Sequence, residues 1–283
     1  MKGLVLASSY GAGAREVDRA FERGVRHFFW GALRRRDFGR ALRRLCASRR
    51  DDLAVAIQSF THRRAALRAS VDLARLRLRT DYVDVLCLAY RNAPIEPRIL
   101  DAARKLVARG VVRSLVVSSH DRPLLRALAA DPTFDALMVR YNAAHRGAER
   151  EVFPAAEAHR MPVLAYTATR WGSLLDPKAL PPNEPRPRAS DCYRFVLSHP
   201  AVAACLFGPA TIAETDEALE ALARGPMTPD ELAWMARVGD AVRRHVRAAP
   251  PLGARDVARH ALEMARSVAR HGLTEDLLSR FNR

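Results

Sequence analysis

Side chains that could transfer a proton or hold an anion recur in this sequence at or just after the ends of short apolar runs. The set is aromatic and basic, and it consists of Trp30, Ser59, Tyr90, His120, Arg140, Tyr141 and Tyr166, with Arg34 to Arg36 shortly after Trp30. A phenol or an imidazole can act as a general acid, and a guanidinium binds carboxylates and phosphates. The set contains no carboxylate to serve as a base. It therefore predicts proton donation by His120, Tyr90 or Tyr141, with arginines that hold an anionic small molecule.

Cysteine and histidine spacing gives no sign of a metal site. Cys46, Cys87, Cys192 and Cys205 are scattered, without the spacing of metal ligands or of a redox pair. We interpret them as small buried side chains and predict no metal. On the run that ends at Trp30, alternation places Phe28 on the same face as Trp30. His27 and Phe29 are then expected on the opposite face, beneath the helices.

The bulk composition is typical of one soluble domain. The chain has 283 residues, of which 49% are hydrophobic and 28% charged. A (β/α)8 barrel needs roughly 250 residues, so no second full domain is required. No apolar run approaches the roughly 20 residues that cross a bilayer, so we expect a cytoplasmic protein without a membrane partner.

A net charge of +16 is typical of proteins that bind nucleic acid, so the distribution of the basic residues matters. The arginines recur in nearly every predicted helix beside Asp or Glu, and they form no stripe along the sequence. Charge alone supports nonspecific attraction to polyanions, and we predict no specific recognition of nucleic acid.

The elements that must position these side chains follow from alternating patterns. Eight short apolar or β-branched runs predict strands at Gly3 to Ser8, Val25 to Trp30, Leu53 to Phe60, Tyr82 to Tyr90, Val112 to Ser118, Ala136 to Tyr141, Pro162 to Thr167 and Ala201 to Phe207. Amphipathic helical patterns lie between them, and no glycine-rich fingerprint opens the first helix. This order predicts a (β/α)8 barrel rather than an open sheet, with its functional residues at the carboxyl ends of the strands.

Two segments depart from the repeating pattern. After Gly225 the sequence becomes wholly helical, so we expect residues 1–225 to form the barrel and residues 226–283 a helical extension packed on its exterior. The segment from Asp176 to Ala189 is rich in proline and long for a loop. It is either a lid over the site or a surface insertion without function.

Several segments resemble those of the aldo-keto reductases, over roughly residues 3 to 225. GVRHFFWG, from Gly24, resembles the family's "G-V-x-x-F-D-T-A", and LRLRTDYVDVLCL resembles its "L-x-x-L-x-x-D-Y-V-D-L". ARKLVARGVVRSLVVSSHDRP, the stretch from Asp135 to Asn142, and MPVLAYTATRWGSLL resemble three further motifs in the same order. The resemblance implies the (β/α)8 fold, carbonyl reduction and a nicotinamide cofactor, either NADP or NAD.

The family's catalytic tetrad of Asp, Tyr, Lys and His is expected to be absent. The resemblance implies that Trp30, Arg35, Ser59 and Ala89 stand at those four positions. In the family the Tyr delivers a proton to the substrate carbonyl, and the other three groups tune and position it. We therefore expect the usual route to be lost.

The resemblance implies a better preserved cofactor site. Tyr166 matches the Tyr that stacks on nicotinamide, and Ser118 the Ser that binds its carboxamide, while Ser119 and Met138 stand for the Asn and Gln. Gly172 and Ser173 match the loop around the pyrophosphate. At the adenine end the matches are Gly208, Glu214 and Glu217, and a carboxylate at Glu214 would repel a 2′-phosphate.

Two functional hypotheses follow. The first is a divergent nicotinamide-dependent oxidoreductase in which His120 or a Tyr donates the proton to a small, anionic substrate. The second is a catalytically inactive protein of the same fold that binds or regulates a protein partner. A third, nonspecific binding of nucleic acid, rests on charge alone.

Overall fold

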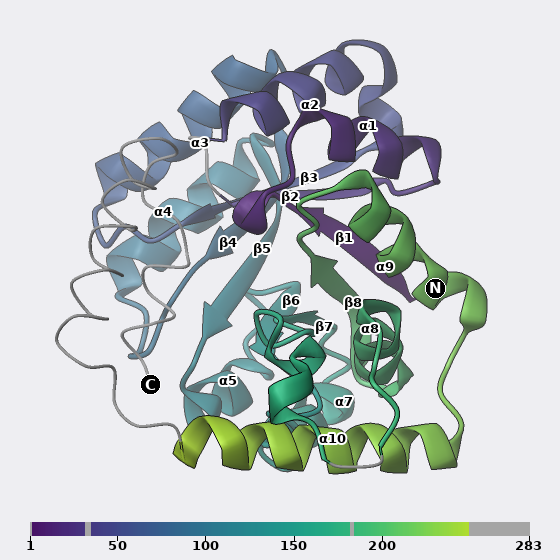
Figure 1. The fold of residues 1–283 in the computed structure, drawn as a ribbon. Helices are drawn as coiled ribbons and strands as arrows, with labels where there is room; N and C mark the ends of the chain where they lie inside the picture. Colours follow the sequence, from purple (N-terminus) through teal and green to yellow (C-terminus); the bar gives the residue numbers. More distant parts are fainter. Residues whose placement is uncertain (1, 32–34, 182–183, 249–283) are drawn as a thin grey trace, which may run out of the picture.

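The chain folds into a closed barrel of eight parallel strands (Figure 1). The computed structural model describes residues 2–31, 35–181 and 184–248. The strands are β1 (Gly3–Ala7), β2 (His27–Trp30), β3 (Ala54–Ser59), β4 (Val83–Leu88), β5 (Val112–Ser119), β6 (Ala136–Arg140), β7 (Val163–Tyr166) and β8 (Val202–Phe207). All eight predicted strands are confirmed, and β1 pairs with both β2 and β8 to close the sheet.

Helices cover the outside of the barrel, as the alternating pattern predicts. They are α1 (Ala14–Glu22), α2 (Arg36–Arg49), α3 (Arg64–Leu78), α4 (Pro97–Ala108), α5 (Arg122–Leu128), α6 (Ala148–Glu151), α7 (Phe153–Ala158), α8 (Ala189–Ser198), α9 (Ile212–Arg224) and α10 (Pro229–Ala248). Short 3₁₀ turns are η1 (Ser8–Tyr10), η2 (Arg50–Asp52), η3 (Ser173–Leu175) and η4 (Pro177–Ala179). None of the described helices is both long and apolar enough to cross a membrane.

The barrel wall separates two apolar layers, because successive side chains of a strand point to opposite faces. The inner layer fills the barrel with Val5, Ala7, Phe29, Ala56, Cys87, Ala89, Val116, Ala136, Met138 and Leu206. The larger outer layer lies between the strands and the helices and contains Phe28, Trp30, Ile57 and Tyr141. All four cysteines are free and buried, which confirms their interpretation as packing residues.

Helix α10 packs along one side of the barrel (Figure 1). Arg194 of α8 donates from Nη2 to the Glu231 carboxylate at 2.8 Å and from Nε to the Gly225 carbonyl at 3.0 Å. Arg146 pairs with Asp240 further along α10 at 3.0 Å. The extension predicted after Gly225 thus begins as a helix. The domain boundary itself stays a prediction, and the second helix expected in the tail lies outside the described residues.

The proline-rich segment from Asp176 to Ala189 is fastened to its surroundings at its described residues. Arg186 donates to the Leu175 carbonyl at 2.8 Å, and Glu184 pairs with Arg237 of α10 at 2.6 Å. These contacts favour the interpretation as a surface insertion over that of a lid.

Candidate active site at the carboxyl end of the barrel

The side chains of Trp30 and Ser59 point away from the barrel interior, so their predicted place in the active site is wrong. Trp30 belongs to the outer layer and is 1% exposed, whereas its neighbour Phe29 belongs to the inner layer. Ser59 lies on the same face of β3 as Ile57, where its hydroxyl accepts a hydrogen bond from Ser70 of α3 at 3.5 Å. The side chains that face inward at these strand ends are Phe29 and Gln58.

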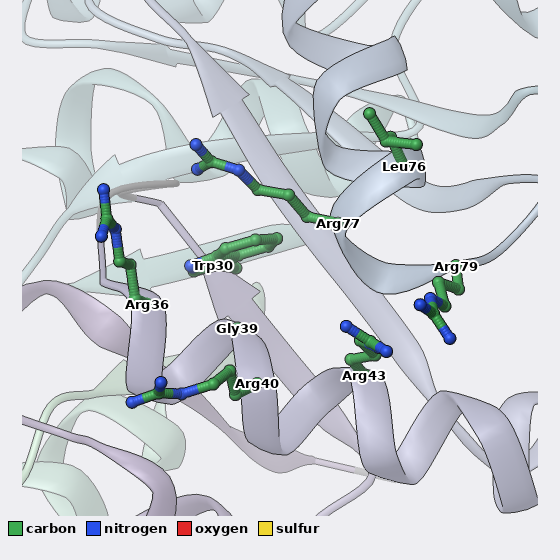
Figure 2. Close-up of a pocket in the computed structure, with 8 residues that line it drawn as sticks. All are labelled: Trp30, Arg36, Gly39, Arg40, Arg43, Leu76, Arg77 and Arg79. Carbon is green, nitrogen blue, oxygen red and sulfur yellow. The ribbon is translucent and has the colours of Figure 1, made fainter.

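Trp30 has a packing role beneath helix α2 instead. A Cβ added at Gly39 would overlap the six-membered ring of the indole, so α2 lies directly on Trp30 (Figure 2). The indole Nε1 donates to the Arg35 carbonyl at 3.3 Å, just where α2 begins. The expectation that His27 and Phe29 lie beneath the helices is wrong for the same reason. Phe29 fills the barrel, and His27 is exposed where β2 begins.

Tyr141 also faces outward and cannot reach a substrate at the barrel opening. Its ring stacks on Phe195 at 5.7 Å between centroids and meets the edge of Phe153 at 5.0 Å. Its hydroxyl donates to Glu149 at 2.6 Å, and burial together with this carboxylate raises the pKa of Tyr141 far above its usual value. The prediction of Tyr141 as a catalytic residue is therefore wrong.

Three of the predicted rings do gather at the carboxyl end of the barrel. The His120 ring lies 4.8 Å from the Tyr90 ring and 6.3 Å from the Tyr166 ring, measured between centroids. Tyr90 and Tyr166 both pack on the inner layer. These side chains come from the ends of β4, β5 and β7, so closure of the barrel brings them together.

Arg140 adds a partly buried positive charge to this group. Its guanidinium stacks on the Trp171 ring at 4.7 Å, and its Nη2 lies 2.8 Å from Nε2 of His145. No carboxylate among the described residues pairs with Arg140, and its Nε is buried without a hydrogen-bond partner. A buried guanidinium without a carboxylate is costly, and a bound anion would offset that cost.

The pKa values in this cluster reflect burial and positive charge. Burial, with a smaller contribution from Arg140, lowers the pKa of His120 from 6.5 to about 4. Burial and the neighbouring arginines, Arg140 first among them, lower the pKa of His145 to about 3. Burial also lowers the pKa of Arg140, while the phenols of Tyr166, Tyr90 and Tyr10 oppose that shift. At neutral pH both imidazoles are uncharged, and the guanidinium supplies the charge.

The residues predicted to hold a carboxamide separate into two groups. Ser118 lies on the inner face of β5, opposite Met138 of β6 in the register of the sheet. Ser119 turns away, donates to Asn92 Oδ1 at 3.1 Å and accepts from the Asp121 amide at 2.9 Å. The hydroxyl of Ser119 therefore joins the β5–α5 loop to Asn92 in the loop after β4. Of the two serines, only Ser118 faces the barrel interior.

The predicted pyrophosphate loop lies beside an aromatic contact that joins two loops. Trp171 donates from Nε1 to the hydroxyl of Tyr10, which connects the β7–α8 loop with the loop after β1. Gly172 follows Trp171 with φ of 83°, and Ser173 begins η3. Gly208 lies under the Tyr10 ring, where an added Cβ would be 3.0 Å from Cδ2. Gly172 and Gly208 therefore border the Tyr10–Trp171 pair.

The two acidic residues predicted near adenine have structural partners. Glu214 accepts the Ala210 amide at 2.7 Å at the start of α9. Glu217 accepts the Ala189 amide of α8 at 3.0 Å and lies 3.6 Å from Arg188. Their roles toward a cofactor stay predictions.

The remaining tetrad positions hold an alanine and an arginine. Ala89 is buried in the inner layer at the end of β4. Arg35 is half-buried, and its Nη2 lies 3.5 Å from the Ser9 carbonyl, while Arg34 lies outside the described residues. The chain has three lysines, Lys2, Lys105 and Lys178, which lie at the opposite end of β1, on α4 and in η4. None of the three lies at the carboxyl end of a strand.

Sequence reasoning missed Tyr10, Trp171 and His145, and it put Phe29 and Gln58 on the wrong face. The first three lie in loops, where no periodicity marks a side chain that turns toward the site. One signal is the backbone: Tyr90, Thr167, Arg170 and Trp171 all have φ between 51° and 63°. Such conformations are uncommon outside glycine and gather at functional sites.

Comparison with known proteins identifies the family and the fold. The profile of the Aldo/keto reductase family matches residues 11–191, and the chain belongs to that family. Its fold resembles the aldo-keto reductase AKR11C1 from Bacillus halodurans in its holo form, with a TM-score of 0.67 and 20% identity over 82% of this chain and 92% of that one. An aldo/keto reductase from Klebsiella pneumoniae, in complex with NADP and acetate, is similar with a TM-score of 0.68 and 21% identity over 84% and 91%.

Proposed function

We propose that this protein is a nicotinamide-dependent oxidoreductase that reduces small carbonyl compounds carrying a negative charge. The observation that carries the proposal is Arg140, a partly buried guanidinium beside Tyr90 and Tyr166 with no carboxylate partner among the described residues. A substrate carboxylate beside the carbonyl would pair with this charge. Membership of the Aldo/keto reductase family supports the reaction class.

The ring end of the site fits a nicotinamide. Tyr166 offers a flat ring and Ser118 a hydroxyl on the inner face of the barrel, and the related Klebsiella structure is a complex with NADP. When bound, the cofactor would supply the hydride for the carbonyl carbon. The amides of Gly172 and Ser173 donate to Thr169 Oγ1 at 3.4 Å and to the Arg170 carbonyl at 3.1 Å, so a pyrophosphate beside this loop would have to replace those hydrogen bonds.

Tyr90 is the proposed proton donor. The low pKa of His120 keeps its imidazole neutral at pH 7, so the protonated form that could donate a proton is scarce. The neutral ring packs beside the Tyr90 ring. Arg140 interacts electrostatically with Tyr90. A cation beside a phenol stabilises the negative oxygen that remains after proton donation. The same charge stabilises the alkoxide that forms on the substrate.

Glu214 leads us to propose NAD rather than NADP as the preferred cofactor. Its carboxylate accepts a hydrogen bond from the Ala210 amide at the start of α9, where the family resemblance places the 2′-phosphate contact. A negative group there repels a phosphate.

The test is a titration with NADH and NADPH followed by tryptophan fluorescence, then absorbance assays with 2-oxo acids and uncharged aldehydes. We expect NADH to bind more tightly and 2-oxo acids to react faster.

Tyr90→Phe should lower kcat by about 100-fold or more, because general acid catalysis contributes roughly that much. Arg140→Met should raise KM for 2-oxo acids about tenfold and spare the uncharged aldehydes. Tyr141→Phe removes the same hydroxyl outside the site and is the matched control.

A second candidate is a binding or regulatory protein that retains the fold without turnover. It is favoured by the inward-facing Phe29, Gln58 and Ala89 and by the absence of a lysine at the carboxyl ends of the strands. Cofactor binding without oxidation of NADH or NADPH by any carbonyl compound would support this candidate and reject the oxidoreductase. Absence of both binding and turnover would reject the nicotinamide site altogether.

A further inference from the structure

A second candidate site lies on the outside of the barrel, between α2 and α3. A pocket of about 460 Å³ is lined by Trp30, Arg36, Gly39, Arg40, Arg43, Leu76, Arg77 and Arg79 (Figure 2). Five of these eight residues are arginines and none is acidic. Helix α2 carries Arg36, Arg40 and Arg43. The C-terminal end of α3 carries Arg77, and Arg79 directly follows that helix. These arginines form no stripe along the sequence, and folding places the two segments together.

Three of the five pocket arginines differ in their pairing from other arginines of α2. Arg44 of α2 pairs with Asp18 at 2.8 Å, and Arg49 lies 3.8 Å from Asp52. In the pocket Arg40 pairs with Asp37, but Arg36, Arg43 and Arg79 form no ion pair with any residue in the described part of the chain. The positive charge of Arg36, Arg43 and Arg79 is therefore not neutralised by the described residues.

The spacing of these charges matches a chain of anions better than a single one. Positions 36, 40 and 43 repeat at four and three residues, so they share one face of α2 over roughly 10 Å. The arginines of α3 face them across the pocket. Arginine binds phosphate oxygens through two parallel hydrogen bonds.

We propose that this pocket binds the phosphodiester backbone of single-stranded nucleic acid without sequence preference. The net charge of +16 adds attraction at longer range. The indole of Trp30 is 1% exposed and cannot stack on a base, so phosphate contacts supply the binding. Leu76, which is 74% exposed, gives the rim an apolar surface for a sugar or base. A rigid duplex is less suited to a pocket between two helices.

The experiment is fluorescence anisotropy of a labelled oligothymidylate of about 20 nucleotides with the full chain, at roughly 50 and 200 mM salt. We expect the triple variant Arg36→Gln, Arg43→Gln, Arg79→Gln to lose affinity about tenfold or more. It should also reduce the slope of log affinity against log salt by roughly 2, because each lost phosphate contact of a single strand contributes about 0.7.

The control carries the same loss of charge elsewhere. Arg109, Arg126 and Arg150 are exposed on or beside α4, α5 and α6, and their triple change to Gln should alter affinity about twofold at most. Equal losses in the two triples would overturn the proposal, because binding would then follow net charge alone. Equal or tighter binding of polyglutamate or of duplex DNA would also overturn it, as would no binding by the unmodified chain. Melting curves of both triples establish that they fold.

Discussion

At the residue scale, Arg140 is unusual because its guanidinium has aromatic and imidazole neighbours but no carboxylate partner among the described residues. The guanidinium lies on Trp171 and beside a neutral His145, and no carboxylate of the described chain neutralises it. Burial of an unpaired charge costs several kcal/mol in general, so a protein that only needed a packed barrel would gain from an apolar residue here. Binding of an anionic ligand is a physical reason to retain it.

His120 predicts a particular dependence of stability on pH. Its pKa is about 4 in the fold, below the ordinary 6.5 that applies to the unfolded chain. Between these values the unfolded chain binds the proton and the folded chain does not, so the free energy of unfolding falls as the pH drops from 6.5 to 4. We expect His120→Gln to show a weaker fall than the unmodified chain.

Urea unfolding at several pH values in that window measures the effect. His27→Gln, which removes an exposed histidine, is the control and should leave the fall unchanged. Parallel pH profiles for the unmodified chain and His120→Gln would contradict the prediction.

At the element scale, the approach of α2 to the barrel depends on Gly39. Alanine favours a helix over glycine by about 1 kcal/mol. A Cβ at this position, however, would lie 2.3 Å from Cζ2 of Trp30, whose ring is 1% exposed and would have to shift. Packing therefore decides the sign of the substitution, against the helix propensity.

We expect Gly39→Ala to lower the free energy of unfolding by roughly 1–3 kcal/mol, the usual cost of overpacking a core. Gly3→Ala is the control, because an added Cβ there meets nothing within 4 Å. Chemical denaturation measures both variants. A more stable Gly39→Ala protein would show that α2 can shift away from Trp30.

At the scale of the whole molecule, Arg194 joins α10 to the barrel. Its side chain is 5% exposed and donates to Glu231 and to the carbonyls of Gly225 and Pro226. Hydrogen bonds from this guanidinium and the Thr228 amide lower the pKa of Glu231 to about 2. Loss of the guanidinium would leave two carbonyls and a partly buried carboxylate without their donor.

We expect Arg194→Met to lower the free energy of unfolding by about 2–3 kcal/mol, within the range for removing one partner of a buried hydrogen-bonded charge. Arg237→Met breaks the exposed pair with Glu184 and should cost less than about 1 kcal/mol. Thermal and urea unfolding compare the two. Equal effects would mean that Arg194 contributes no more than a surface ion pair.

The sequence by itself determined the eight strands, the helices between them and the residues that follow the strand ends. Local patterns carry this information, because alternation and helical periodicity repeat within a few residues of chain. The family resemblance, and not these patterns, singled out Ser118 and Tyr166, whose side chains lie on the inner face, while Tyr90 and His120 lie together at the barrel opening.

Only the tertiary structure decided which face of β2 and β3 looks inward. A shift of one residue moves every side chain of a strand to the other face. The expected match of Trp30 to the family's Asp contains such a shift, because a residue-by-residue match of G-V-x-x-F-D-T-A from Gly24 puts the Asp at Phe29. Pairing of Trp30 with Ile57 in the closed sheet puts Phe29 inside and Trp30 under α2. The Arg140 cluster and the arginine pocket likewise join segments that are distant in the chain. Contacts between distant segments produce no periodicity in the sequence, so the sequence alone does not predict them.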